Sequence, residues 1–138
     1  MRRIVVLPIL AMLSSALAAE SAELAGGWTA REAVRDGAAA GELVGHRLEF
    51  AGNRFEIMAK DGTLLYAGTY TLDATVLPAR IDFRHDGGEA VGQTWEGIYR
   101  LDGGALTIVD DAPDPAKGRP ADFAAPAGSG YVMLVFVR

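Results

Sequence analysis

Residues 94–110 have the sequence TWEGIYRLDGGALTIVD, and this stretch decides the fold class. Two segments rich in aromatic and β-branched residues, Thr94–Leu101 and Ala105–Asp110, flank the turn signal Asp102-Gly103-Gly104. Such side chains favour the pleated backbone of a strand, and Asp-Gly and Gly-Gly pairs adopt the positive φ angles that tight hairpin turns need. The stretch therefore predicts a β-hairpin.

The same pattern continues in both directions along the chain. Turn signals recur at short intervals, and no long helical period, coiled coil or internal repeat separates them. The segments between the turns predict six further strands: Trp28–Val34, His46–Ala51, Arg54–Ala59, Leu64–Leu72, Ala79–His85 and Tyr131–Val137. Three segments differ: Glu20–Ala25 favours one helical turn, Ala38–Leu43 favours a short helix, and Asp111–Gly130 is a long Pro-, Ala- and Gly-rich loop.

Eight antiparallel strands joined by hairpin links are best accommodated by closure of the sheet. A closed barrel has no exposed strand edge, and eight strands leave an interior wide enough for side chains or one small ligand. We therefore predict an all-β fold, an eight-stranded antiparallel up-and-down β-barrel. A two-sheet sandwich is the alternative.

The N-terminal residues have the pattern of a secretory signal peptide. A cationic start, Met1-Arg2-Arg3, is followed by an apolar run from Ile4 to Leu13 and by small residues at Ala16 and Ala18. We predict cleavage near Ala18, so that residues 1–18 are the signal and residues 19–138 form the barrel of a secreted or periplasmic protein. A transmembrane anchor is the alternative, but the apolar run is shorter than the ~20 residues that cross a bilayer. We expect no membrane span in the mature chain.

Composition excludes several classes of function. The chain of 138 residues has no cysteine, which rules out a disulfide scaffold, a thiolate zinc site and a cysteine nucleophile. The formal net charge is −5 and the pI is near 4.9, whereas nucleic-acid-binding domains are usually basic. We therefore expect no nucleic-acid partner.

An ordered set of landmarks extends over nearly the whole mature chain. It includes Gly26-Gly27-Trp28, Arg35-Asp36-Gly37, Gly68–Asp73, Gly97–Gly103, and Arg119-Pro120 with Phe123. Together they resemble an uncharacterised family of secreted bacterial lipocalin-like proteins that is abundant in planctomycetes. The resemblance implies a lipocalin-like barrel with no established activity and no catalytic residues to transfer. Members of that family often carry a cysteine in the strand that ends here at Val109-Asp110, where this chain has none.

Strand direction assigns the links to the two ends of the predicted barrel. The links at 35–45, 86–93 and 111–130, with the turn near Asp61-Gly62, fall at one end, which we call the mouth. Trp28 and the shorter links at 52–53, 73–78 and 102–104 fall at the other, where Trp28 is expected to plug the barrel. Ligands enter such barrels at an open end, so the mouth is the candidate site.

Side-chain alternation places three polar residues on apolar faces near the mouth. His46 shares a face with Leu48 and Phe50, His85 with Ile81 and Phe83, and Glu32 with Trp28. We predict a site for a small, largely apolar ligand, with Glu32, His46 and His85 as polar contacts and a wall of Tyr66, Tyr70, Phe83, Trp95 and Tyr99. A Glu32–His46 pair would raise the histidine pKa and make binding depend on pH.

Other roles remain open for the same residues. Two histidines and one glutamate are a donor set for a divalent metal, and polar residues at the end of a barrel are often simply solvated or paired. A protein-interaction module of the cell envelope, with a packed barrel and the loop 111–130 as its contact surface, is the alternative function. An enzyme ranks last, because Ser129 lacks the context of a nucleophile elbow and Asp110, Asp111 and Asp114 lack calcium-loop spacing. We expect no cofactor, and we expect Arg119 to pair with an acid and pin the long loop to the barrel.

Overall fold

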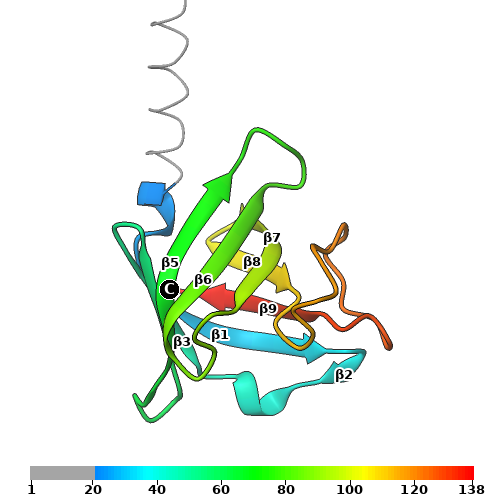
Figure 1. Ribbon diagram of the computed structural model, residues 1–138, viewed down its shortest axis with the longest axis horizontal. Helices are drawn as coiled ribbons and strands as arrows, with labels where there is room; N and C mark the ends of the chain where they lie inside the picture. The colour runs from blue at the N-terminus through cyan, green and yellow to red at the C-terminus, as the bar shows by residue number, and fades with distance from the viewer. Residues whose placement is uncertain (1–20) are drawn as a thin grey trace, which may run out of the picture.

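The computed structural model describes residues 21–138, in which antiparallel β-strands curve into a closed barrel (Figure 1). The predicted signal peptide lies outside this range. Residues 21–24 are helical, so the described part of the predicted N-terminal turn is confirmed. Within the described range, no helix has the length and apolar character needed to cross a membrane.

The strands lie close to the predicted segments. Between β1 and β3 the predicted helix is a two-residue strand, β2, followed by a short 3₁₀ helix, Gly41–Leu43. The bounds are β1 (Gly26–Arg35), β2 (Ala38–Ala39), β3 (Arg47–Ala51), β4 (Arg54–Met58), β5 (Leu64–Asp73), β6 (Arg80–Gly88), β7 (Thr94–Asp102), β8 (Ala105–Asp110) and β9 (Val132–Val137).

Pairing between the first and last long strands closes the sheet. From β3 onward each strand pairs antiparallel with the next in sequence, and β1 pairs with β3 on one side and β9 on the other. β2 is a short extension that pairs with the end of β1. The fold is the predicted all-β, eight-stranded antiparallel up-and-down barrel of the lipocalin-like type, and the sandwich alternative is excluded.

Trp28 closes one end of the barrel, as predicted. Its side chain is buried, its indole N–H donates to the carbonyl oxygen of Leu24 at 2.8 Å, and the Arg138 guanidinium lies 4.0 Å from the ring centroid. The helical turn and the last residue of the chain therefore cover the tryptophan from outside. The buried cluster continues from Trp28 through Leu48 and Phe50 into the barrel.

A β-bulge in β1 reverses the predicted alternation. Ala30 pairs with Phe136 and Glu32 with Val135, so Arg31 is an extra residue without a register partner. Two residues on one strand then oppose one on the other, and the side chains that follow change face. Ala33 is buried, whereas the Glu32 side chain is 65% exposed on the outer surface. The prediction that Glu32 faces the interior is wrong for this reason.

The long loop forms an outer layer on the barrel wall. Ile98 on β7 and Val109 on β8 are register partners that face outward, yet they are 1% and 0% exposed. Arg119 holds the loop there by donating to an Asp82 carboxylate oxygen at 2.7 Å and to the Gly97 carbonyl oxygen at 2.8 Å. This confirms the predicted pairing of Arg119 with an acid, and it explains why Val109 is apolar although it faces outward.

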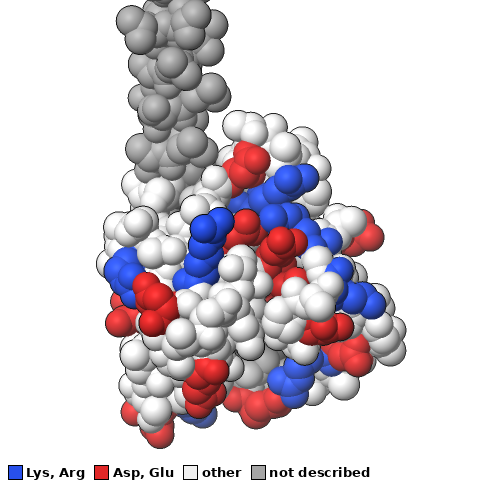
Figure 2. Space-filling model, in the orientation of Figure 1, with Lys and Arg blue, Asp and Glu red and all other residues white. Residues whose placement is uncertain are grey.

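Charges on the surface are mixed. Basic and acidic side chains are interspersed over the face shown in Figure 2, without one dominant basic patch. The Arg54 guanidinium forms a bidentate pair with the Asp86 carboxylate, with both N–O distances at 2.9 Å.

Candidate ligand site at the mouth of the barrel

A cavity of about 210 Å³ lies inside the barrel at the predicted mouth. Residues from the mouth-end links line it, including Leu43, Ala112 and Pro113, which confirms the assignment of the two ends. Its deeper wall is apolar and comes from β3, β4, β8 and β9: Leu48, Ile57, Ile108, Leu134 and Phe136. Such a concave apolar space with few polar groups is the usual form of a small-molecule site.

Three aromatic side chains form one side of the cavity: Tyr66 on β5, Phe83 on β6 and Trp95 on β7. The rings of Tyr66 and Trp95 meet edge to face, with centroids 4.8 Å apart. The Trp95 indole N–H donates to the Gln93 amide oxygen at 2.9 Å, which fixes the indole from the β6–β7 link. These rings give the cavity a rigid wall that suits a flat apolar ligand.

Asp110 is a deeply buried acidic residue of the cavity wall. It ends β8, is 4% exposed, and its Oδ1 accepts a hydrogen bond from the Ala112 N–H at 2.9 Å. Burial raises its pKa to about 7, and the neighbouring Asp111 carboxylate adds to the shift. Asp111 is fully buried, but it points elsewhere, since its two oxygens accept the N–H groups of Glu96 and Gly118.

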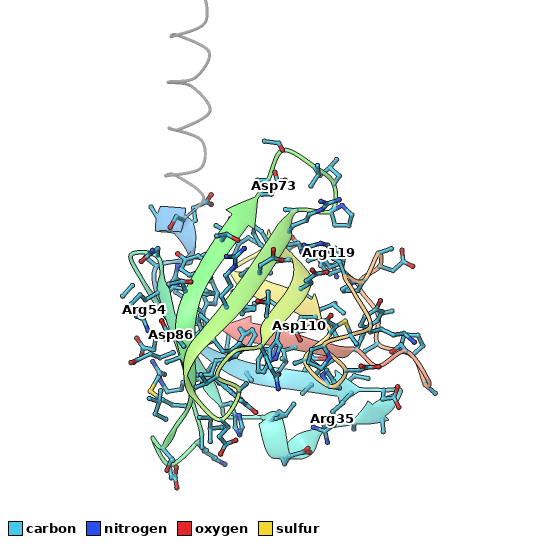
Figure 3. All side chains as sticks on the ribbon, viewed as in Figure 1. Arg35, Arg54, Asp73, Asp86, Asp110 and Arg119 are labelled. Carbon is cyan, nitrogen blue, oxygen red and sulfur yellow. The ribbon has the colours of Figure 1, made fainter. Side chains whose placement is uncertain are left out.

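Arg35 and His46 complete the polar part of the cavity. Arg35 and Asp110 are both register partners of Val132 on β9, so they lie on one row across three strands, two strand spacings or roughly 10 Å apart. Figure 3 shows Arg35 and Asp110 toward the same end of the barrel, with Asp73 at the other. The Arg35 guanidinium donates to the Glu42 carboxylate, which lowers the pKa of that exposed carboxyl group.

His85 is buried behind the aromatic wall. It is 5% exposed, and its ring lies 4.0 Å from the Trp95 ring, 5.2 Å from Phe55 and 5.6 Å from Tyr66, measured between centroids. Neither imidazole nitrogen has a hydrogen-bond partner. Burial among these rings lowers the pKa of His85 to about 4, so the imidazole is neutral near pH 7.

The structure brings together half of the residues predicted for the site. His46, Tyr66, Phe83 and Trp95 line the cavity, and His85 contacts two of them without lining it. Tyr70 is near the Trp28 end, where its hydroxyl donates to the Gly52 carbonyl oxygen at 3.0 Å and lies 2.9 Å from the Ser21 hydroxyl.

Tyr99 and Glu32 also lie away from the cavity lining. Tyr99 is 2% exposed within the core cluster. Glu32 lies on the outer surface within 3.4 Å of the Arg31 guanidinium, so the predicted Glu32–His46 pair is wrong. His46, His85 and Glu32 therefore do not form the three-donor set that a metal ion would need. Within residues 21–138, no group of three or more His, Asp or Glu side chains is arranged to hold a metal ion.

Two polar residues of the cavity, Asp110 and Arg35, were missing from the predicted site, as were its aliphatic residues. A signal for Asp110 is present in the sequence, because it ends the largely apolar segment Leu106–Val109 at the mouth end. Arg35 has no such signal, because its inward position depends on the bulge at Arg31.

Comparisons with known proteins add no assignment. No protein-family model, curated protein or solved structure matches the chain. The resemblance to secreted lipocalin-like proteins stays a prediction, and the cavity is the feature of the molecule that points to a function.

Proposed function

We propose that the barrel binds a small, largely apolar molecule in the cavity at its mouth. The observation that supports this most directly is a concave space of about 210 Å³ at the barrel mouth, with an aliphatic floor, an aromatic wall and three polar side chains. A barrel serving only as a packed scaffold would fill its interior with side chains, because protein interiors are packed with few voids larger than a water molecule. Binding is therefore a better explanation of the cavity than scaffolding.

The cavity volume limits the size of the ligand. A dry apolar cavity of roughly 150 Å³ accommodates benzene. The space here is moderately larger, at about 210 Å³, which fits one six-membered ring with a short substituent, or a short aliphatic chain of similar size. Large polycyclic ligands would require the walls to move.

Toluene is a suitable first probe, and the two tryptophans report where it binds. We expect toluene to shift the Trp95 indole N–H signal in a ¹H–¹⁵N spectrum, because Trp95 lines the cavity. The Trp28 signal serves as an internal reference, because that ring is buried at the opposite end. Equal shifts of both signals, or no shift of either at saturating toluene, would contradict the proposal.

A pair of variants on β9 separates loss of the cavity from damage to the strand. Leu134→Trp places a large ring into the cavity and should abolish toluene binding. Val135→Trp is the matched control, because Val135 pairs with the exposed Glu32 on the outer face. We expect the control to bind toluene within about twofold of the unmodified chain.

The proposal places this binding outside the cytoplasm, in the periplasm or the surrounding medium. The supporting observation is the signal-like pattern of residues 1–18. N-terminal sequencing of the protein recovered from its own cell envelope should begin at Ala19. A mature protein that retains Met1 would contradict export by cleavage.

A second candidate function is interaction with an envelope protein. Among residues 21–138, three of the four large exposed hydrophobic residues belong to mouth-end segments: Val44 at 40% exposed, Leu64 at 47% and Val91 at 64%. Native mass spectrometry of the envelope-purified protein separates the two functions. A retained small molecule that Leu134→Trp removes supports the ligand. A retained second chain that Val91→Ser removes and Leu134→Trp keeps supports the partner.

A further inference from the structure

The cavity wall combines a buried carboxyl group with aromatic rings, and both kinds of group attract organic cations. Asp110 lines the cavity at 4% exposed, and within residues 21–138 its one hydrogen-bond donor is the Ala112 N–H. Removing a carboxylate from water is costly unless a cation or several donors compensate it. The carboxyl group is therefore poorly compensated in the ligand-free protein, and a positively charged ligand would supply what it lacks.

The cations of the surrounding protein do not supply this compensation. The Arg35 guanidinium is directed to Glu42 at the rim and is separated from Asp110 by the width of β9. Arg119 pairs with Asp82 on the outer face of the barrel. Asp111, directly after Asp110, adds negative potential, and its own oxygens are already hydrogen-bonded to backbone N–H groups. The local field at Asp110 thus favours a cation.

The aromatic residues of the same cavity favour an organic cation over a metal ion. Tyr66, Phe83 and Trp95 offer π surfaces, which pack against the apolar part of an organic cation and also attract its ammonium group. The apolar floor lacks the additional oxygen donors that a hard metal ion requires. One carboxylate, several rings and a small, largely apolar volume fit a single ammonium group on a small hydrophobic body.

We propose that the cavity selects small hydrophobic amines, with the Asp110 carboxylate as the counter-ion of the ligand ammonium group and the rings of Tyr66 and Trp95 around its apolar part. This inference depends on the proposed ligand-binding function and names the chemical class of the ligand. Binding forms one charge-assisted hydrogen bond from ammonium to carboxylate. Where Asp110 is protonated beforehand, its proton passes to solvent.

Four probes of nearly equal size test the inference by calorimetric titration. Toluene, benzyl alcohol, benzylamine and benzoate share one ring and differ in the head group and its charge. At about pH 8, where benzylamine is cationic and Asp110 ionised, we expect benzylamine to bind at least tenfold more tightly than benzyl alcohol, with benzoate the weakest.

Substitution of Asp110 tests the counter-ion directly. Asp110→Asn keeps the shape and removes the charge, and we expect it to reduce the preference for benzylamine over benzyl alcohol at least tenfold. Asp114→Asn is the matched control, because it removes an equal charge from an exposed position in the loop that follows β8. The control should keep the preference within about twofold.

The pH dependence of benzylamine binding tests the same contact without any variant. The titratable and charged groups around Asp110 are Asp111 beside it, Glu96 on β7, Arg35 on β1, His46 before β3, Tyr66 on β5 and His85 on β6. Because the carboxylate form binds the cation, benzylamine affinity should rise about tenfold per pH unit below pH 7 and then level off. Benzyl alcohol affinity should not rise in parallel.

The outcomes distinguish this inference from the function on which it depends. Preference for benzylamine that Asp110→Asn removes and Asp114→Asn keeps supports the amine site. Binding of toluene with equal or weaker binding of benzylamine overturns the amine inference and leaves ligand binding intact. Failure of all four probes to bind overturns both.

Discussion

At the scale of single residues, two buried titratable groups have opposite effects on stability. Burial raises the pKa of Asp110 to about 7 and lowers that of His85 to about 4. In each case the folded state favours the neutral form. The folded protein therefore retains a proton on Asp110 that the unfolded chain loses, and lacks a proton on His85 that the unfolded chain gains.

The sign of each effect follows from linkage between protonation and folding. The Asp110 contribution is fully present below the unfolded-state pKa of roughly 4 and is lost as pH rises through about 7. The His85 contribution is fully present above the unfolded-state pKa of roughly 6.5 and is lost as pH falls toward about 4. Between these limits the two contributions change in opposite directions with pH, and at about 1.4 kcal/mol per pKa unit each spans roughly 3–4 kcal/mol at most.

A substitution at either residue should reveal the pH dependence that the other residue gives to the free energy of unfolding. Asp110→Asn removes the contribution of Asp110 and keeps that of His85. The free energy of unfolding of this variant should therefore fall as pH is lowered from about 6.5 to about 4. His85→Phe keeps the contribution of Asp110, so the free energy of unfolding of this variant should fall as pH is raised over the same range. Urea unfolding at a series of pH values measures both, and parallel curves for the two variants would contradict the assignment.

For single residues, side-chain alternation predicted which side chains face the barrel interior. His46, Tyr66, Phe83 and Trp95 were predicted at the mouth, and they line the cavity because β3, β5, β6 and β7 keep the expected face there. His85 faces inward as predicted, but the packing of Tyr66 and Trp95 over it is a tertiary feature with no period in the sequence.

At the scale of elements, the loop 111–130 stabilises the wall through one arginine. The Arg119–Asp82 pair is partly buried, with side-chain exposures of 21% and 27%, and the guanidinium also donates to the Gly97 carbonyl oxygen. The comparable Arg54–Asp86 pair is exposed at 49% and 54%. The chain thus contains a matched pair of Arg–Asp contacts that differ in burial.

Replacing each arginine with methionine should have unequal effects. Arg119→Met leaves Asp82 and the Gly97 carbonyl without their donor, so we expect the free energy of unfolding to fall by about 1–3 kcal/mol. Arg54→Met should cost clearly less, because the exposed pair is screened by solvent. Amide hydrogen exchange in residues 111–130 should accelerate in the first variant alone. Equal losses in the two variants would contradict the role of the loop as a held outer layer.

The elements also show where sequence reasoning fails. The strand segments were predicted from turn spacing and composition, but the bulge at Arg31 was not, because a one-residue insertion leaves no compositional mark in an otherwise regular strand. That single residue moved Glu32 to the surface and allowed Arg35 to line the cavity. The error is therefore local to β1, and the predicted faces of the other strands that meet at the mouth were unaffected.

At the scale of the whole molecule, closure follows from strand number and connectivity, which the sequence shows plainly. Eight strands, each antiparallel to the one before it, leave two edges that are satisfied by pairing β1 with β9. Which end stays open depends on side-chain packing. The plug at Trp28 and the cavity at the mouth lie at opposite ends, so stability and binding should be separable by position.

The plug and the cavity can be tested with one variant at each end. Trp28→Phe removes the hydrogen bond to the Leu24 carbonyl oxygen and weakens the stacking of Arg138, so unfolding free energy should fall by about 1–3 kcal/mol. Its toluene affinity should stay within about twofold, because the altered ring does not line the cavity.

Leu134→Trp should show the reverse, with binding lost and stability changed by less than about 2 kcal/mol, since the added ring enters existing space. Urea unfolding and toluene titration on both variants measure the separation, and loss of binding in Trp28→Phe with its fold intact would mean that the two ends are coupled through the core.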